Sequence, residues 1–170
     1  FMKLTSDSPF WLRKNGILQT VPFLESDIEC DLLVIGAGVT GAIVTHALMQ
    51  LGRSIVVVDS RDVACGSTSA STALLQYEID KALVDMAKMI GLENSQLAYQ
   101  LSHQSIDQLE AMIQKEGIEC DFERKISLYL ARDRKSAVRL AHEARARRAI
   151  GLDVEYHNQH QLKDRFGIEG

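Results

Sequence analysis

The chain has 170 residues, 46% hydrophobic and 25% charged, which is ordinary for a globular protein with room for one sizeable core. Its formal net charge of −4 gives no reason to expect general affinity for nucleic acid or for a membrane surface, and no apolar stretch is long enough to span a bilayer. The three cysteines, Cys30, Cys65 and Cys120, form neither a metal-ligand pattern nor a disulfide framework, which predicts a reducing, cytoplasmic location.

The first 30 residues carry scattered apolar side chains rather than a periodic pattern. Trp11 and Phe23 are typical of such isolated anchors. Neither an apolar signal core nor a small-residue cleavage site precedes them. We therefore predict an N-terminal extension over residues 1–30 that packs, in partly irregular form, on its own domain, with a place for Trp11 in a partner interface as the alternative.

Residues 31–59 have the pattern of a strand, a helix and a second strand. The apolar run Asp31-Leu-Leu-Val-Ile leads into glycines at positions 36, 38 and 41, and a second run, Ser54-Ile-Val-Val-Val-Asp59, follows the helix. The helix between the runs carries an apolar stripe on one face, formed by Val39, Ile43, Ala47 and Leu51. This spacing predicts a βαβ unit, in which a dinucleotide lays its pyrophosphate on the helix N-terminus.

Each glycine of the first loop has its own expected purpose. Gly36 permits a tight turn out of the strand, Gly38 lets a phosphate approach the backbone, and Gly41 lets the helix lie close to the strand. The amides around Val39 and Thr40 have no acceptor inside the helix, so we expect them to point toward the ligand.

Asp59 ends the second strand, 23 residues after the first glycine, where a carboxylate accepts hydrogen bonds from the adenosine ribose. A negative charge at this position repels a 2′-phosphate and disfavours NADP.

The loop over residues 60–73 helps to distinguish NAD from a dinucleotide that carries a larger flat group. It has few bulky side chains and many hydroxyl and backbone donors, at Gly66, Ser67, Thr68, Ser71 and Thr72. An NAD enzyme normally has an unspecialised helix here, whereas a small-residue loop suits a large flat group packed against the backbone. Two alternatives stay open from the residues alone: an NAD-binding reductase domain, and a non-catalytic module that binds a dinucleotide or docks a partner.

Hydrophobic periodicity predicts helices over 79–90 and 94–116, the second with a core stripe at Leu97, Leu101, Leu109, Met112 and Ile113. Alternation predicts strands over 120–123 and 126–131, and a further strand around Val154 and Tyr156. Helices are expected over 133–150, with a basic solvated face, and near 159–166. No cluster in this part of the sequence predicts a metal site.

The glycine pattern, the acid at the end of the second strand and the run Gly66-Ser-Thr-Ser-Ala-Ser-Thr-Ala-Leu-Leu75 together resemble the N-terminal part of the D-amino-acid-oxidase-like FAD-dependent oxidoreductases, which include glycine oxidase, sarcosine oxidase and FAD-dependent glycerol-3-phosphate dehydrogenase. The resemblance implies FAD as cofactor and oxidation of a small amine, amino acid or hydroxy compound. It also implies a role for each matching residue: Gly36, Gly38, Val39 and Thr40 at the pyrophosphate, Asp59 at the ribose, Ser60 and Arg61 beside the adenine, Gly66, Ser67 and Thr68 at the pyrophosphate and ribityl chain, and Ser71, Thr72, Ala73 and Leu74 near the isoalloxazine.

The chain departs from the family in one residue and in length. The family often has Ala or Gly where this sequence has Thr45, so looser packing of the helix on the sheet is expected. Family members are about twice as long, so the resemblance implies a truncated protein and names no catalytic residue.

The expected fold class is α/β: a Rossmann-like FAD-binding βαβ unit, then helices, then the start of a mixed α+β substrate domain. The expected divisions are 1–30 for the extension, 31–118 for the FAD-binding portion and 119–170 for the incomplete substrate domain. We expect the 170-residue piece to self-associate or to need a missing C-terminal half or partner chain, and to be inactive alone.

Overall fold

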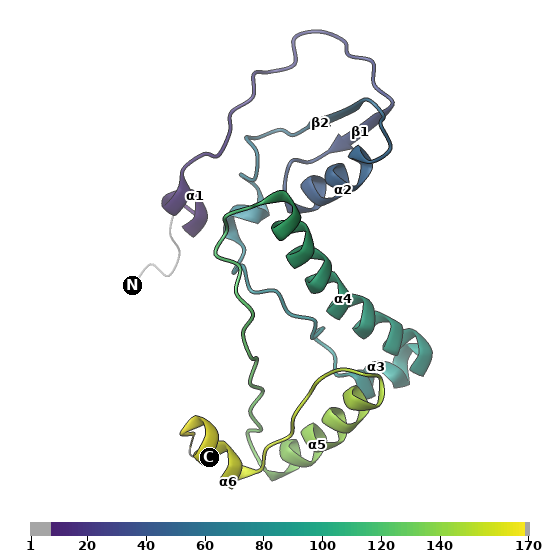
Figure 1. Ribbon diagram of the computed structural model, residues 1–170, viewed down its shortest axis with the longest axis vertical. Coiled ribbons are helices and arrows are strands. Elements are labelled where there is room, and N and C mark those ends of the chain that lie inside the picture. The colour runs from purple at the N-terminus through teal and green to yellow at the C-terminus, as the bar shows by residue number, and fades with distance from the viewer. Residues whose placement is uncertain (1–7, 169–170) are drawn as a thin grey trace, which may run out of the picture. The chain divides into compact units, whose positions relative to one another are not determined.

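The computed structural model describes residues 8–168, and its elements are shown in Figure 1. The chain forms two compact units, the first up to Leu74 and the second from Leu75 onward. The predicted divisions after residues 30 and 118 stay predictions.

The first unit contains a short helix, a parallel pair of strands and a connecting helix. Its elements are α1 (Phe10–Asn15), β1 (Leu32–Ile35), α2 (Val39–Met49), β2 (Ile55–Val58) and the short 3₁₀ helix η1 (Ser67–Ala70). β1 and β2 pair in parallel, with Leu32 opposite Ile55 and Ile35 opposite Val58. The predicted order of strand, helix and strand is therefore present, because apolar and β-branched runs favour strands on both sides of a helical segment.

α2 turns a different face inward from the one that its apolar stripe predicts. Its less exposed positions include Gly41, Thr45 and Leu48, whereas Val39 is 55% exposed and Ile43 38%. Gly41 brings the backbone of α2 against the end of β1, and this close contact fixes the rotation of the helix. Thr45 consequently buries its hydroxyl, which has no hydrogen-bond partner among the described residues.

The second unit is helical over its described residues. It contains α3 (Leu83–Ile90), α4 (Leu92–Glu116), α5 (Arg134–Ala149) and α6 (Gln159–Phe166), close to the helices that the sequence predicts. Gly117 ends α4 with φ +63°, a left-handed conformation that favours glycine. The side chain of Asp133 accepts a hydrogen bond from Ser136 N at the start of α5, and Asn158 forms a capping box with Gln161 at the start of α6.

The core of the second unit is small. Leu83, Tyr99 and Leu152 are its buried hydrophobic members, and the side chains of Tyr77, Met86, Ala146, Ile150 and Val154 pack against them. α4 contributes Tyr99 rather than the predicted stripe, since Leu97 and Leu101 are each 53% exposed. The predicted stripe is therefore wrong in its first two members.

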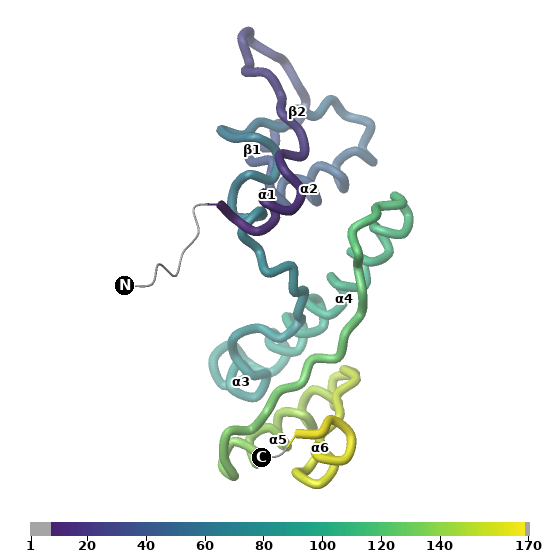
Figure 2. The backbone as a smooth tube through the Cα atoms, turned by 90° about the vertical axis from the view of Figure 1, so that its left-hand side faces the viewer, coloured from purple at the N-terminus to yellow at the C-terminus, as the bar shows by residue number. Residues whose placement is uncertain are grey.

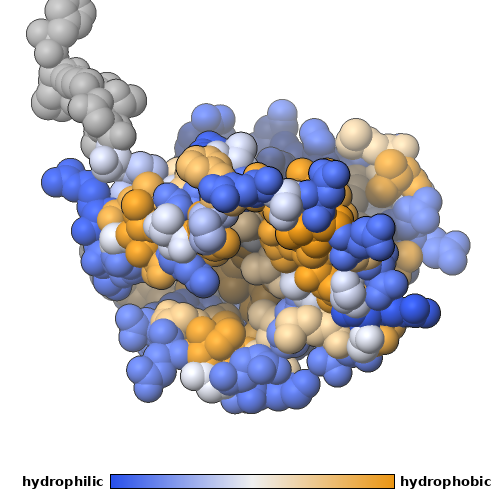
Figure 3. Space-filling model, turned by 90° about the horizontal axis from the view of Figure 1, so that it is seen from above, coloured by the Kyte–Doolittle hydropathy of each residue, from blue (hydrophilic) through white to orange (hydrophobic). Residues whose placement is uncertain are grey.

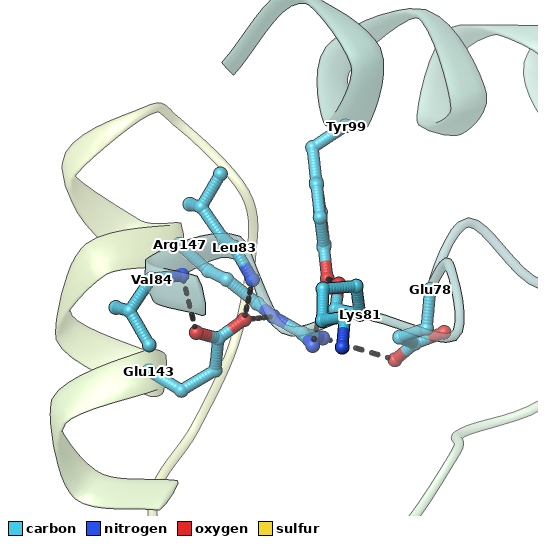
Figure 4. Close-up of polar contacts among 7 residues, drawn as sticks. All are labelled: Glu78, Lys81, Leu83, Val84, Tyr99, Glu143 and Arg147. Carbon is cyan, nitrogen blue, oxygen red and sulfur yellow. Dashed lines mark hydrogen bonds and ion pairs between the residues drawn. The ribbon is translucent and has the colours of Figure 1, made fainter. Parts of the chain in front are cut away.

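A charged network holds α3 to α5 (Figure 4). Glu143, on α5, accepts hydrogen bonds from the first amides of α3, Leu83 N at 2.7 Å and Val84 N at 3.0 Å, and from Arg147 Nε at 2.8 Å. Arg147 also reaches Glu78 and lies over the Tyr99 ring. Burial disfavours the charge of Arg147, but its hydrogen bond to Glu143 is among the contacts that raise its pKa above the usual range.

The strands predicted over 120–123, over 126–131 and around Val154 are absent from the described part of the second unit. The segment between α4 and α5 runs without regular structure in Figure 2. A strand needs a pairing partner, and within residues 8–168 β1 and β2 pair only with each other. The alternating apolar residues are left uncovered, with Ile126 79% exposed and Tyr129 80%.

Apolar side chains also reach the surface elsewhere, as the patches in the space-filling view indicate (Figure 3). Phe23 is 93% exposed and Ile35 is 81% exposed. Among the described residues, no helix is both long and apolar enough to cross a membrane.

Candidate functional site

A cavity of about 570 Å³ opens beside the end of β1 and the start of α2. Its volume is within the range of small-molecule sites. Three segments of the first unit contribute to it: the end of β1 with the first turns of α2, the residues after β2, and the loop around η1. The lining residues are Val34, Ile35, Gly36, Gly38, Val39, Thr40, Gly41, Val44, Asp59, Arg61, Gly66, Ser67, Thr68 and Ser71.

Asp59 ties the first glycine loop to the end of β2. One carboxylate oxygen accepts a hydrogen bond from Ala37 N at 2.7 Å, and the other accepts one from Arg61 N at 2.9 Å. The bond from the Ala37 amide is the main cause that holds the pKa of Asp59 below its usual 3.8, and the bond from Arg61 adds to it. Asp59 is therefore ionised at neutral pH, and its charge lies at the rim of the cavity.

Thr68 ties the second loop to α2. Its hydroxyl oxygen accepts a hydrogen bond from Val39 N, the first amide of α2, at 2.9 Å. The Val39 amide is thus satisfied within the protein, contrary to the expectation that it points toward a ligand. The amides of Thr40 and Gly41 follow in the same helical turn, where no acceptor exists inside the helix.

Two glycines permit the close packing around this helix N-terminus. A Cβ on Gly41 would lie 1.8 Å from the carbonyl oxygen of Gly36, so only glycine allows α2 to approach the end of β1 this closely. A Cβ on Gly38 would lie 3.0 Å from the hydroxyl oxygen of Thr68. Gly38 therefore leaves room for Thr68 as well as for a ligand.

Gly36 has the conformational freedom that its turn requires. Its φ is +108°, which side chains rarely adopt, and a Cβ there would meet nothing within 4 Å. The backbone at this point of the cavity is bare and accessible.

Most of the residues that the sequence singles out meet at this cavity, but four of them, Ser60, Thr72, Ala73 and Leu74, do not line it. Three lining residues were missed: Val34, Ile35 and Val44. All three are apolar members of β1 and α2, so their composition indicates core packing and gives no signal of a site.

The cavity suits an anionic nucleotide by its chemistry. A helix N-terminus with the open amides of Thr40 and Gly41 attracts phosphate. Bare glycine backbone lets the phosphate approach, and Arg61 adds a positive charge near Gly66. An ionised Asp59 keeps free lone pairs that accept ribose hydroxyls. These features fit the diphosphate and ribose of a dinucleotide such as FAD.

The chain is 27% identical over 147 residues to YhfW of Bacillus subtilis (strain 168), whose name describes a Rieske 2Fe-2S iron–sulfur protein. The match covers 85% of this chain and 29% of YhfW. It is 21% identical over 157 residues to OrdL of Haemophilus influenzae, which is named as an oxidoreductase; that match covers 92% of this chain and 36% of OrdL. The chain thus spans about a third of the length of these relatives.

A shorter match concerns MnmC of Maricaulis maris, a bifunctional protein named for tRNA 5-methylaminomethyl-2-thiouridine biosynthesis. It is 35% identical over 57 residues, which is 34% of this chain and 10% of MnmC. No solved structure matches the chain significantly.

The residues that match a known family lie in both units. The model of the FAD-dependent oxidoreductase family matches residues 31–170, which include every lining residue of the cavity but leave out α1. The resemblance stated from the glycine pattern and the hydroxyl-rich loop is confirmed, and with it FAD as the cofactor of the family. The chain belongs to the FAD-dependent oxidoreductase family.

Proposed function

We propose that the first unit binds FAD through its βαβ unit, which we interpret as Rossmann-like, and that it serves a flavin-dependent oxidation of a small amine, amino acid or hydroxy compound. One observation carries the proposal. The loops after β1 and β2 and the loop around η1 converge on one cavity, at a helix N-terminus, inside the residues that match the family.

The residues divide by the part of FAD that they suit. We assign the pyrophosphate to the backbone at Gly36, Gly38 and Thr40, because the two glycines carry no covering side chain and the amide of Thr40 has no acceptor inside the helix. The amide of Gly36 itself donates to the carbonyl oxygen of Val58, so Gly36 contributes open space rather than a donor. We assign the adenosine ribose to Asp59 and the adenine side to Arg61. We assign the flavin end of the cofactor to the loop from Gly66 to Leu74, where bulky side chains are few.

The chemistry of the reaction belongs to the flavin, which when bound accepts a hydride from a C–H next to an amine or hydroxyl group. The chain's own residues bind and orient the cofactor. Asp59 holds the first glycine loop through Ala37, and Thr68 holds the second loop against α2. Substrate oxidation is proposed for the whole protein; the isolated 170 residues are expected to be inactive and to self-associate.

An NAD-binding reductase domain is the main competing function. The hydroxyl-rich loop around η1 favours FAD, because Thr68 makes this loop part of the nucleotide site rather than an ordinary connection. The cytoplasmic location stays a prediction from the three separated cysteines.

The test is to identify the cofactor. FAD is added to the purified 170-residue protein, bound flavin is measured by absorption and fluorescence, and the ligand released on denaturation is identified. Wild type should bind FAD and not NAD. Gly38→Val should abolish flavin binding with nearly unchanged far-UV circular dichroism, because the extended backbone of Gly38 suits a β-branched residue. The new side chain obstructs the cavity and displaces the Thr68 hydroxyl, which would lie 3.0 Å from the new Cβ.

Ala47→Val, on the exposed side of α2, is the matched control and should bind FAD as wild type does. Binding of NAD in place of FAD would refute the proposal. A Gly38→Val protein that still binds FAD would show that the pyrophosphate lies elsewhere.

A further inference from the structure

The N-terminal helix α1 contacts the cofactor loop, although it lies outside the residues that match the family. The indole N–H of Trp11 donates a 2.8 Å hydrogen bond to the carbonyl oxygen of Ser71, a residue 60 positions later. Ser71 both caps η1 and lines the cavity. This polar contact of α1 with the rest of the unit thus ends at the site.

The contact gives the carbonyl oxygen of Ser71 a hydrogen-bond partner within the protein. The last carbonyl groups of a helix accept no hydrogen bond from within the helix, and Ser71 follows the last residue of η1. η1 has only four residues, too few to be stable alone. It is held at two points, by Thr68 on Val39 and by Trp11 on Ser71.

Trp11 is itself held in place. The ring of Phe10 packs edge-on against it at 4.9 Å between centroids, and Lys14 Nζ lies 5.5 Å from the ring centroid. The ring is half-buried, and an aromatic side chain with one polar atom suits a boundary of this kind. Trp11 is also the single tryptophan of the sequence, so its fluorescence reports this contact alone.

We propose that Trp11 is a positioning residue for the FAD site: α1 fastens the loop around η1 in the conformation that binds the cofactor. The inference rests on the proposed function. It assigns a role in binding to the N-terminal extension. Ordering of residues 10–15 should raise the affinity for FAD, and FAD binding should in turn order these residues.

The first experiment removes the hydrogen bond and keeps the ring. Trp11→Phe loses the indole donor, so the loop spends less time in its binding conformation and the Kd for FAD should rise, at most about tenfold, which corresponds to about 1.4 kcal/mol for one hydrogen bond. The circular dichroism of the bound flavin should change as well, which a purely structural role would not cause. Phe23→Ala, which removes a ring that is 93% exposed, is the control and should change neither value.

The second experiment uses wild type alone and does not depend on a variant that folds. If Trp11 stabilises the binding conformation, FAD must stabilise the Trp11 contact in return. Hydrogen exchange of residues 10–15 should slow when FAD binds, and the emission of Trp11 should be quenched by the flavin.

The outcomes separate this inference from the proposed function. Wild-type protein that does not bind FAD refutes both. If Gly38→Val abolishes binding but Trp11→Phe keeps the wild-type Kd and flavin dichroism, the cofactor site stands and the role of Trp11 is wrong. Unchanged exchange of residues 10–15 on FAD binding would also overturn that role.

Discussion

Replacing Gly41 with alanine tests the close approach of α2 to β1. The new Cβ would lie 1.8 Å from the carbonyl oxygen of Gly36, and contacts below 3.0 Å do not occur, so the helix must move by at least about 1.2 Å. Because the contacted atom is backbone, no side chain can turn away. Overpacking of this kind costs about 1–3 kcal/mol, which lowers the Tm by roughly 2–12 °C in a chain of this length. The amides of the first turn leave the cavity, so FAD should bind more weakly.

The assay combines thermal unfolding with FAD titration. Gly52→Ala is the control: its φ of +62° makes alanine strained by about 1–2 kcal/mol, but its Cβ would meet nothing within 4 Å. It should lower the Tm without changing the Kd for FAD. Alanine is the better helix former by about 1 kcal/mol, so a Gly41→Ala protein that gains stability and binds FAD normally would refute the close-approach argument.

Three further changes act on other contacts. Glu143→Ala should destabilise the second unit by about 3–5 kcal/mol in chemical denaturation, because it leaves Arg147 and the first amides of α3 without their buried partner. The carboxylate of Asp59 has a lowered pKa, so its stabilising bond from Ala37 should be fully present above pH 3.8 and lost as the pH falls further; the Tm difference between wild type and Asp59→Asn should shrink in that acid range. Thr45→Val should raise the free energy of unfolding by about 1–3 kcal/mol, since it removes an unsatisfied buried hydroxyl at constant shape, and a loss of stability would show that this hydroxyl has a partner.

The sequence predicted the elements of the first unit better than the contacts between them. Apolar runs and glycine spacing are local signals, and they indicated β1, α2 and β2 correctly. The bond from Val39 N to Thr68 joins residues 29 positions apart, and no local pattern encodes it. The prediction of the inward face of α2 was wrong for a related reason. The contact at Gly41 sets the rotation of the helix, so the apolar stripe through Val39 and Ile43 does not face inward.

The strand predicted over 126–131 is a second case in which a local pattern was not enough to predict the structure. Alternation of apolar residues indicates which side chains of a strand would share one face. The strand is stable only when a partner strand pairs with its backbone. The described residues supply no such partner, and Ile126 and Tyr129 lie exposed. Helices such as α4 and α5 satisfy their own backbone, so their periodicity was enough to predict them.

The cavity is held together by single hydrogen bonds between loops rather than by a continuous sheet. Asp59 fastens the first glycine loop, Thr68 fastens η1 to α2, and Trp11 fastens the end of η1. Segments held in this way belong to the least stable part of a fold, and a ligand that contacts all of them orders them together. FAD should therefore stabilise the first unit by about 2.7 kcal/mol when its concentration is 100 times the Kd. Thermal unfolding at increasing FAD measures this, and a Tm that does not depend on FAD would mean that the folded protein does not bind FAD, which would refute the proposed cofactor site.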